Sequence, residues 1–373
     1  MPKANRVHPT RPAVVGTGLV ALDIVLRRGH SPVITAGGTC ANVLAILSYL
    51  GWRSTLISRL QDDRAAAYVL QDLSTWGVST GYAQLGPTCA TPVIVERIRC
   101  DAHGELFHTF SFSCPVCGRR LPSYQPVTSS SMTSLLDGNP ILGNVAFVDR
   151  VSRGALDLAQ HTAAEGGLVI FEPSSIRDEK LFKEMMLSAH IVKYAQDSLA
   201  ECGEVSWSDA TRLEIQTLGR GGARFRTNLG GLQRLWRHSQ AIPVADFVDA
   251  CGAGDWFTAV ILDRLCRKGS KGLASTSRTG LLDAVDRAQR IAAWNCAFPG
   301  ARGGMYSAEG RRELRSLVRV GRRLRATHCE EESDEAAAQI CGCSSKRSAD
   351  ETAVQGPSQT RSQPAQSRGP RAL

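Results

Sequence analysis

The chain has 373 residues, of which 43% are apolar and 21% are charged, so it can bury a large core. It contains no run of about 18 apolar residues, which argues against a membrane-spanning helix. Its polar N-terminal residues lack the apolar segment of a secretory signal. We therefore expect a cytoplasmic protein with no membrane partner.

The formal net charge of +9 raises the question of nucleic-acid binding. The excess does not form a basic stripe with interleaved aromatic residues. Its densest part is a group of seven arginines between Arg311 and Arg325, a pattern typical of a solvated basic helix. Nucleic acid is therefore an unexpected partner, whereas a phosphorylated substrate would suit a positive field.

Strands and helices alternate along most of the chain. In chain order, the hydrophobic pattern predicts a strand at 12–19, a helix at 40–50, a strand at 54–59, a helix at 63–76, strands at 145–148, 168–171, 190–193, 213–217 and about 241–248, a helix from about 252 and a helix over 281–297. This order predicts an α/β fold, with a doubly wound, mostly parallel sheet sandwiched by helices.

Two further regions depart from this alternation. Residues 92–98 and 106–112 predict two strands joined by a turn, and thus a hairpin outside the main sheet. From about residue 327 the chain is first acidic and then rich in Ser, Gln, Pro and Arg. Such a composition cannot bury enough apolar surface to offset its ordering entropy, so residues 327–373 are predicted to be a disordered tail.

The segment from Val248 to Asp255 carries the strongest chemical signal, because its glycines stand between a predicted strand and an apolar helix. The amides of Gly252, Ala253 and Gly254 would open that helix, and a helix N-terminus attracts an anion such as a phosphoryl group. Asp255, in the first turn, is placed to take a proton from an attacking hydroxyl. The alternative is an ordinary glycine turn with an acidic first helical turn.

Asp249 to Asp255 resembles the C-terminal signature of the ribokinase-like (PfkB) carbohydrate kinases, usually Asp-Thr-x-Gly-Ala-Gly-Asp. Ala250 departs from the usual Thr. The resemblance implies that the glycine amides form an anion hole and that Asp255 is the general base. It also implies a ribokinase-like fold with a small β lid over the sugar site.

Other motifs follow in the order of that family over residues 12–305. Those that resemble its substrate-binding motifs are Asp23, after Gly16-x-Gly18, and Gly37, Gly38 and Asn42 of the di-glycine motif. Those that the resemblance assigns to the nucleotide are Thr217, Gly219 and Gly222 of a Thr-x-Gly-x-x-Gly loop, Asn295, which precedes Pro299-Gly300-Ala301, and Asp249.

The resemblance implies a kinase domain over residues 12–326, with lid and insertion at about 23–36 and 92–125. It implies ATP and Mg²⁺ as cofactors, a sugar or related polyol as the small-molecule substrate, and a homodimer formed through the lid. A nucleoside kinase is an alternative, with Phe107, Phe110 and Phe112 as an aromatic platform. A ligand-binding protein without catalytic activity on the same fold is another.

One family motif is altered. The usual Asn-x-x-Glu, which is linked to magnesium and phosphate, corresponds to Gln196-Asp197-Ser198-Leu199. Asp197 could substitute in part through water. The polar strand ends at Asp149 and Glu172 are further candidates for substrate contacts.

The chain has twelve cysteines, and Cys114-Pro-Val-Cys117 is half of a zinc knuckle. A complete site needs two more ligands, which Cys100, His108 or a second subunit could supply. The alternative is that these cysteines are free thiols. Cys341-Gly-Cys343 lies in the predicted tail and is expected to have no structural role.

Overall fold

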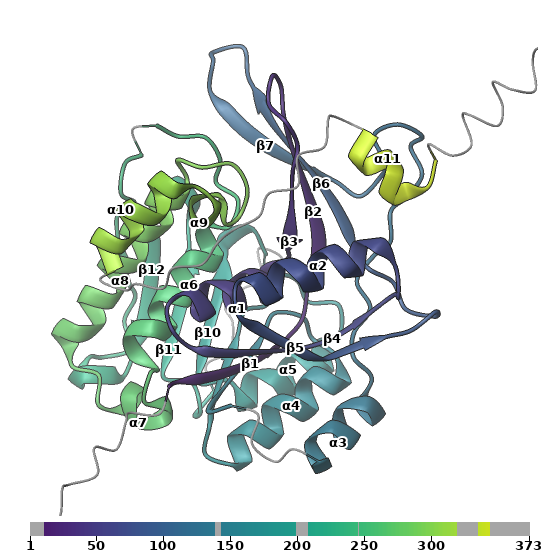
Figure 1. Ribbon diagram of the computed structural model, residues 1–373. Coiled ribbons are helices and arrows are strands. Elements are labelled where there is room, and N and C mark those ends of the chain that lie inside the picture. The colour runs from purple at the N-terminus through teal and green to yellow at the C-terminus, as the bar shows by residue number, and fades with distance from the viewer. Residues whose placement is uncertain (1–10, 139–142, 199–207, 245, 319–334, 344–373) are drawn as a thin grey trace, which may run out of the picture.

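The computed structural model describes residues 11–138, 143–198, 208–244, 246–318 and 335–343 (Figure 1). Within these ranges, no helix combines the length and the apolar character needed to cross a membrane.

Nine of the described strands form one sheet, in the order β13-β12-β11-β10-β9-β8-β1-β4-β5. Their bounds are β1 Ala13–Thr17, β4 Arg53–Leu60, β5 Val78–Leu85, β8 Val145–Val148, β9 Leu168–Phe171, β10 Ile191–Ala195, β11 Leu213–Thr217, β12 Ala223–Thr227 and β13 Arg237–Ser239. In this order, each pair of neighbours from β11 through β1 to β5 is parallel, and β12 and β13 add to the edge beside β11 as antiparallel strands. Strands β1, β8 and β9 are buried along their whole length, as expected for a sheet covered on both faces.

Helices cover the two faces of this sheet (Figure 1). One face packs against α1 Thr39–Tyr49, α2 Arg64–Thr75, α6 Ala253–Leu265 and α8 Arg278–Asn295, and the other against α3 Ser129–Gly138, α4 Arg153–Ala164 and α5 Glu179–Ser188. The remaining helices are α7 Gly269–Ala274, α9 Gly303–Tyr306, α10 Ala308–Val318 and α11 Glu335–Cys341. Helix α6 is buried over most of its length because apolar residues predominate along it, and the residues at its start are half-buried.

A second sheet projects from the main body, with the order β3-β2-β6-β7 (Figure 1). Its strands are β2 Ala21–Arg27, β3 Val33–Gly37, β6 Val93–Cys100 and β7 Leu106–Ser111. The hairpin of β6 and β7 follows the predicted pattern. The predicted fold class, a doubly wound and mostly parallel sheet between helices with a small β lid, is confirmed.

Two expectations differ from the structure. Residues 241–248 form no strand among those described, because Pro243 lacks an N–H and the amides of Val248 and Asp249 donate instead to the Cys296 carbonyl. Residues 335–341, predicted to belong to a disordered tail, form α11. Residues 327–334 and 344–373 of that tail lie outside the described residues, as do the arginines after Val318.

Candidate active site

The loop from Asp249 to Gly252 leads into α6 and is fixed by buried polar contacts. The Asp249 carboxylate accepts from the amides of Cys251 (2.9 Å) and Gly300 (2.8 Å). It also bonds Nδ1 of His108 on the lid, at 2.7 Å. The side-chain amide of Asn295 (Nδ2) donates to the backbone carbonyl of Cys251 at 3.1 Å. Asp249 and Asn295, both predicted to bind the nucleotide, therefore hold the loop that precedes the helix.

The N-terminus of α6 offers unpaired amides. Gly252 is its N-cap, with φ 72°. The Ala253 amide donates to the Ala250 carbonyl at 3.2 Å. Among the contacts of the described residues, the amides of Gly252 and Gly254 have no protein acceptor. Two of the three predicted anion-hole amides are thus available to a ligand, at the positive end of the helix dipole.

Asp255 lies in the first turn of α6, in the wall of a cavity of about 920 Å³. Its Oδ2 accepts a 2.8 Å hydrogen bond from the side-chain amide (Nδ2) of Asn42. Burial raises the pKa of Asp255 to about 7, helped by the negative charge of Glu172 and opposed by Lys193 and by the Asn42 bond. A carboxyl group with this pKa can alternate between proton acceptor and donor near neutral pH.

Glu172, directly after β9, contacts the first turns of α6. Its carboxylate pairs with Lys193 of β10 and accepts from the Thr258 hydroxyl at 2.6 Å. Lys193 also donates to the Gly254 carbonyl at 3.1 Å. Glu172 was a candidate for substrate contact, whereas Lys193 drew no prediction because a lysine in an apolar strand has no motif of its own. The charges of Glu172 and Lys193 act on the pKa of Asp255 in opposite directions.

Asp23 of β2 lies in the same cavity wall and is buried. Its Oδ1 has no hydrogen-bond partner among the described residues. Burial raises the pKa of Asp23 to about 7, opposed by Arg302 and by the Gly38 amide. A Cβ on Gly37 would lie 1.7 Å from the Asp23 carboxylate, so only glycine fits beside it. Asp23, Gly38 and Asn42, the residues expected to bind the substrate, line one cavity.

Arg302 is a buried residue of this site that the sequence did not indicate. Its Nε donates to the Asn42 side-chain oxygen at 2.9 Å, and its Nη2 donates to the Ala36 carbonyl (2.5 Å) and to Asp72 (2.8 Å). Asn42 is therefore held between Arg302 and Asp255. The only signal was its position directly after the Pro299-Gly300-Ala301 motif.

The far wall of the cavity is formed by the lid and by β8. Asp149, directly after β8, accepts from the Leu19 amide (2.9 Å) and from Arg150 (2.7 Å). Burial raises its pKa to about 6, although Arg150 opposes this. Aromatic residues Phe110, Phe112 and Tyr124 also line the cavity, and Phe107 of the predicted platform does not.

A second cavity, of about 780 Å³, lies on the other side of the α6 N-terminus. Gly219 and Arg220 of the β11–β12 turn line this cavity, as does Cys296, the residue directly after α8. Thr217 ends β11, and Gly222 closes the turn through its carbonyl, which accepts from the Leu218 amide at 2.8 Å. Ala250 and Ala253 line this second cavity, whereas Gly252 and Asp255 line the first. The start of α6 thus separates two ligand-sized spaces.

Comparison with known proteins agrees with this geometry. A model of the pfkB family of carbohydrate kinases matches residues 16–98. Aminoimidazole riboside kinase of Salmonella typhimurium is 26% identical over 272 residues, which are 67% of this chain and 80% of that protein. Residues 16–98 thus match the pfkB family of carbohydrate kinases, and the chain is similar to a riboside kinase over a longer stretch.

Solved structures show the fold of this chain in other proteins. The structure of aminoimidazole riboside kinase from Salmonella enterica, complexed with aminoimidazole riboside and an ATP analogue, is 21% identical with a TM-score of 0.58. It covers 82% of this chain and 99% of its own. Ribokinase from Giardia lamblia is 14% identical with a TM-score of 0.62, and also covers 82% and 99%.

The altered metal motif at 196–199 lies only in part within the described residues. Gln196 and Asp197 are exposed directly after β10, and Leu199 lies outside the described residues. The exposed Asp197 carboxylate is a hard oxygen ligand at the carboxyl edge of the parallel strands β10 and β11. It could hold a hydrated Mg²⁺ ion.

Proposed function

We propose that the chain is an ATP-dependent phosphotransferase that moves the γ-phosphoryl group of ATP to a hydroxyl of a sugar or related polyol. The observation that carries this proposal is the position of Asp255 in the first turn of α6. It lies in the wall of the first cavity, where the start of α6 separates that cavity from the second, and beside two amides with no protein acceptor. One cavity suits the acceptor and the other the nucleotide.

In the proposed reaction the protein positions two ligands and stabilises charge. The unpaired Asp23 oxygen and Asn42 hold acceptor hydroxyls, and Asp255 takes the proton of the attacking hydroxyl. The amides of Gly252 and Gly254 stabilise the charge that develops on the transferred group. When bound, Mg²⁺ neutralises phosphate charge, and Asp197 is the carboxylate that would hold it through water.

The test is ATP consumption by the purified chain with Mg²⁺ against a panel of sugars, sugar acids, sugar phosphates and nucleosides. Turnover of one compound that is lost in Asp255→Asn would support the proposal and identify the acceptor. ATP binding without turnover of any compound would contradict it and favour a binding protein without catalytic activity.

A riboside acceptor is a second candidate, which the aromatic wall favours. Phe110 and Phe112 are 48% and 57% exposed and line the cavity beside Tyr124, so they could stack on a base. The Salmonella relative is named for a riboside. Comparing kcat/KM for ribosides and for the free sugars separates the candidates, and Phe110→Leu should weaken only riboside binding.

We expect kcat/KM to fall as the pH drops below about 7, because protonated Asp255 cannot accept the hydroxyl proton. Lys193 lowers the pKa of Asp255, so Lys193→Met should raise it and move the pH profile to higher pH. Lys183→Met, which changes an exposed lysine on α5, is the control and should leave the profile unchanged. Identical profiles for the two variants would contradict the role of Lys193.

Arg302→Met should raise KM by about tenfold or more, the range for losing hydrogen bonds from a charged group. The substitution removes the hydrogen bond that Arg302 donates to the Asn42 side chain, and it removes the positive charge that lowers the pKa of Asp23. Asp23 should then stay protonated to higher pH. Because wild-type Asp23 has a pKa of about 7 and is already mostly protonated at pH 6, the rise in KM should be larger at pH 8 than at pH 6. Arg302→Lys keeps the charge, so its rise in KM should depend less on pH than that of Arg302→Met.

The exposed Arg264, which pairs with Asp283, provides a control variant, Arg264→Met. A KM of Arg302→Met that rises equally at both pH values would indicate a general loss of packing and would remove Arg302 from this positioning role.

A homodimer through the lid remains a proposal. Strand β7 is an edge of the lid sheet, and Phe107 on it is 42% exposed, which supports pairing with a second copy. Sedimentation of the wild type and Phe107→Ser would test it, since a monomeric wild type contradicts the proposal.

A further inference from the structure

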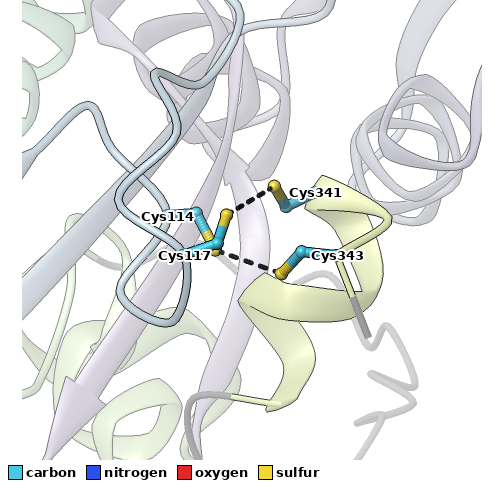
Figure 2. Close-up of side chains that lie close together, drawn as sticks. All are labelled: Cys114, Cys117, Cys341 and Cys343. Carbon is cyan, nitrogen blue, oxygen red and sulfur yellow. Dashed lines mark hydrogen bonds between the residues drawn. The ribbon is translucent and has the colours of Figure 1, made fainter. Parts of the chain in front are cut away.

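Four cysteines gather outside both cavities, where the loop after β7 meets α11 (Figure 2). The Sγ atoms of Cys114 and Cys343 are 3.7 Å apart, and those of Cys117 and Cys341 are 3.6 Å apart. All four sulfur atoms lie within 4.8 Å of one another. The cluster unites a cysteine pair from the lid loop with one from the C-terminal segment.

These distances fit a tetrahedral metal site. With Zn–S bonds of about 2.3 Å, the edges of the sulfur tetrahedron are about 3.8 Å long. A disulfide would need about 2.05 Å between sulfur atoms. Four thiolates at tetrahedral spacing select zinc over the hard cations, which prefer oxygen ligands.

The lid pair sits on a closed turn. The Gly118 amide donates to the Cys114 carbonyl at 2.9 Å, and the Cys114 amide donates to the Arg119 carbonyl at 2.8 Å. Both sulfur atoms thereby face α11 (Figure 2). The second pair lies at the C-terminal end of α11, where the Cys343 amide donates to the Ala338 carbonyl at 3.2 Å. Each pair is held by local backbone geometry.

The structure corrects the expected ligand set. Cys100 is exposed and lies outside the cluster, and His108 faces Asp249. The sulfur atoms that complete the cluster belong to Cys341 and Cys343, which were expected to have no structural role. No second subunit is needed, because this chain holds all four sulfur atoms.

Helix α11 needs such an anchor. It has seven residues, and a helix of this length is marginal without tertiary packing. Among its described side chains, Ala338 is buried and Gln339 accepts a 3.4 Å bond from Arg64 of α2. We propose that Cys114, Cys117, Cys341 and Cys343 bind one structural zinc ion, which fastens the C-terminal segment at 335–343 to the lid loop.

The zinc site also braces the acceptor cavity, a consequence that rests on the proposed function. The cysteine turn is closed at its base, where the Leu121 amide donates to the Phe112 carbonyl at 2.9 Å and Ser113 pairs with Arg120. Phe112 and Arg120 both line the cavity. Loss of zinc should therefore raise KM for the acceptor more than it lowers kcat.

The first experiment measures zinc in the full-length chain purified without chelators. We expect about one zinc ion per chain, and replacement by Co²⁺ should give the absorption of a tetrahedral thiolate site. The double variants Cys114→Ser/Cys117→Ser and Cys341→Ser/Cys343→Ser should each retain less than about a tenth of that zinc. Cys89→Ser/Cys100→Ser, which changes two cysteines outside the cluster, should retain all of it.

Several outcomes would overturn the inference. Zinc retained after Cys341→Ser/Cys343→Ser would remove the C-terminal pair from the site. A chain with no zinc that also fails to take up added Zn²⁺ or Co²⁺ would remove the site altogether, as would disulfides joining these pairs. Zinc content does not depend on turnover, so a failed kinase assay with one bound zinc ion would contradict only the proposed function.

Discussion

Asp255→Asn is expected to lower kcat by about 10²-fold or more, the range for removing a general base. The carboxylate lies in the first turn of α6 beside two amides without protein acceptors, where an attacking hydroxyl would lose its proton. An asparagine cannot take that proton. It can still accept the hydrogen bond from Asn42, so the neighbouring geometry should persist.

This variant should remain folded. Because burial raises the pKa of Asp255 to about 7, ionisation of the carboxyl costs stability once the pH exceeds its unfolded pKa. A neutral asparagine avoids that cost, so the melting temperature at pH 8 should be equal or higher. Thermal unfolding and single-substrate kinetics measure the two effects separately.

Asp263→Asn is the matched control, because Asp263 lies on the same helix and contacts Trp52 and Arg267. It should lose stability but keep kcat. Near-normal turnover by Asp255→Asn would remove Asp255 from the role of base.

Gly252→Ala is expected to lower kcat/KM by about 10²- to 10³-fold, the range for losing a donor that stabilises the transition state. The residue has φ 72°, and a Cβ there would lie 2.2 Å from the Ala301 carbonyl oxygen. Because that contact is with backbone, the loop or α6 must shift. The shift would move the Gly252 and Gly254 amides away from the transferred phosphoryl group.

Gly231→Ala isolates the effect of strain. Gly231 has φ 71°, and a Cβ there would meet nothing within 4 Å. It should cost about 1 kcal/mol of unfolding free energy, as expected for a left-handed position, and leave kcat/KM unchanged. Denaturant titration and steady-state kinetics compare the variants. Equal activity losses in both would place the effect of Gly252 in folding.

A cluster of two carboxylates and a histidine connects the lid to the loop that precedes α6. The side-chain oxygen and nitrogen atoms of Glu96, His108 and Asp249 lie within 4.8 Å of one another. Burial and the nearby charge of Asp249 raise the pKa of Glu96 to about 9. A protonated Glu96 leaves Asp249 as the charged partner of His108. This bond joins the lid hairpin directly to the loop that precedes α6.

Much of this architecture could be predicted from the sequence because its causes are local. Alternating apolar runs define the parallel sheet, and the turn between residues 98 and 106 defines the lid hairpin. The glycines before Asp255 predicted a helix start with a carboxylate in its first turn, because only a few residues decide how a helix begins. Asp23 and Asn42, which we propose hold the acceptor, could be named from their motifs.

Only the tertiary structure decided which distant groups share a site. Arg302 reaches Asn42 across 260 residues, and Cys343 reaches Cys114 across 229. Neither contact leaves a periodic or local signal, and Asn295 turned out to hold Cys251 for the same reason. Local sequence sets backbone conformation, whereas the packing of whole elements brings buried charges and sulfur atoms from distant segments into contact.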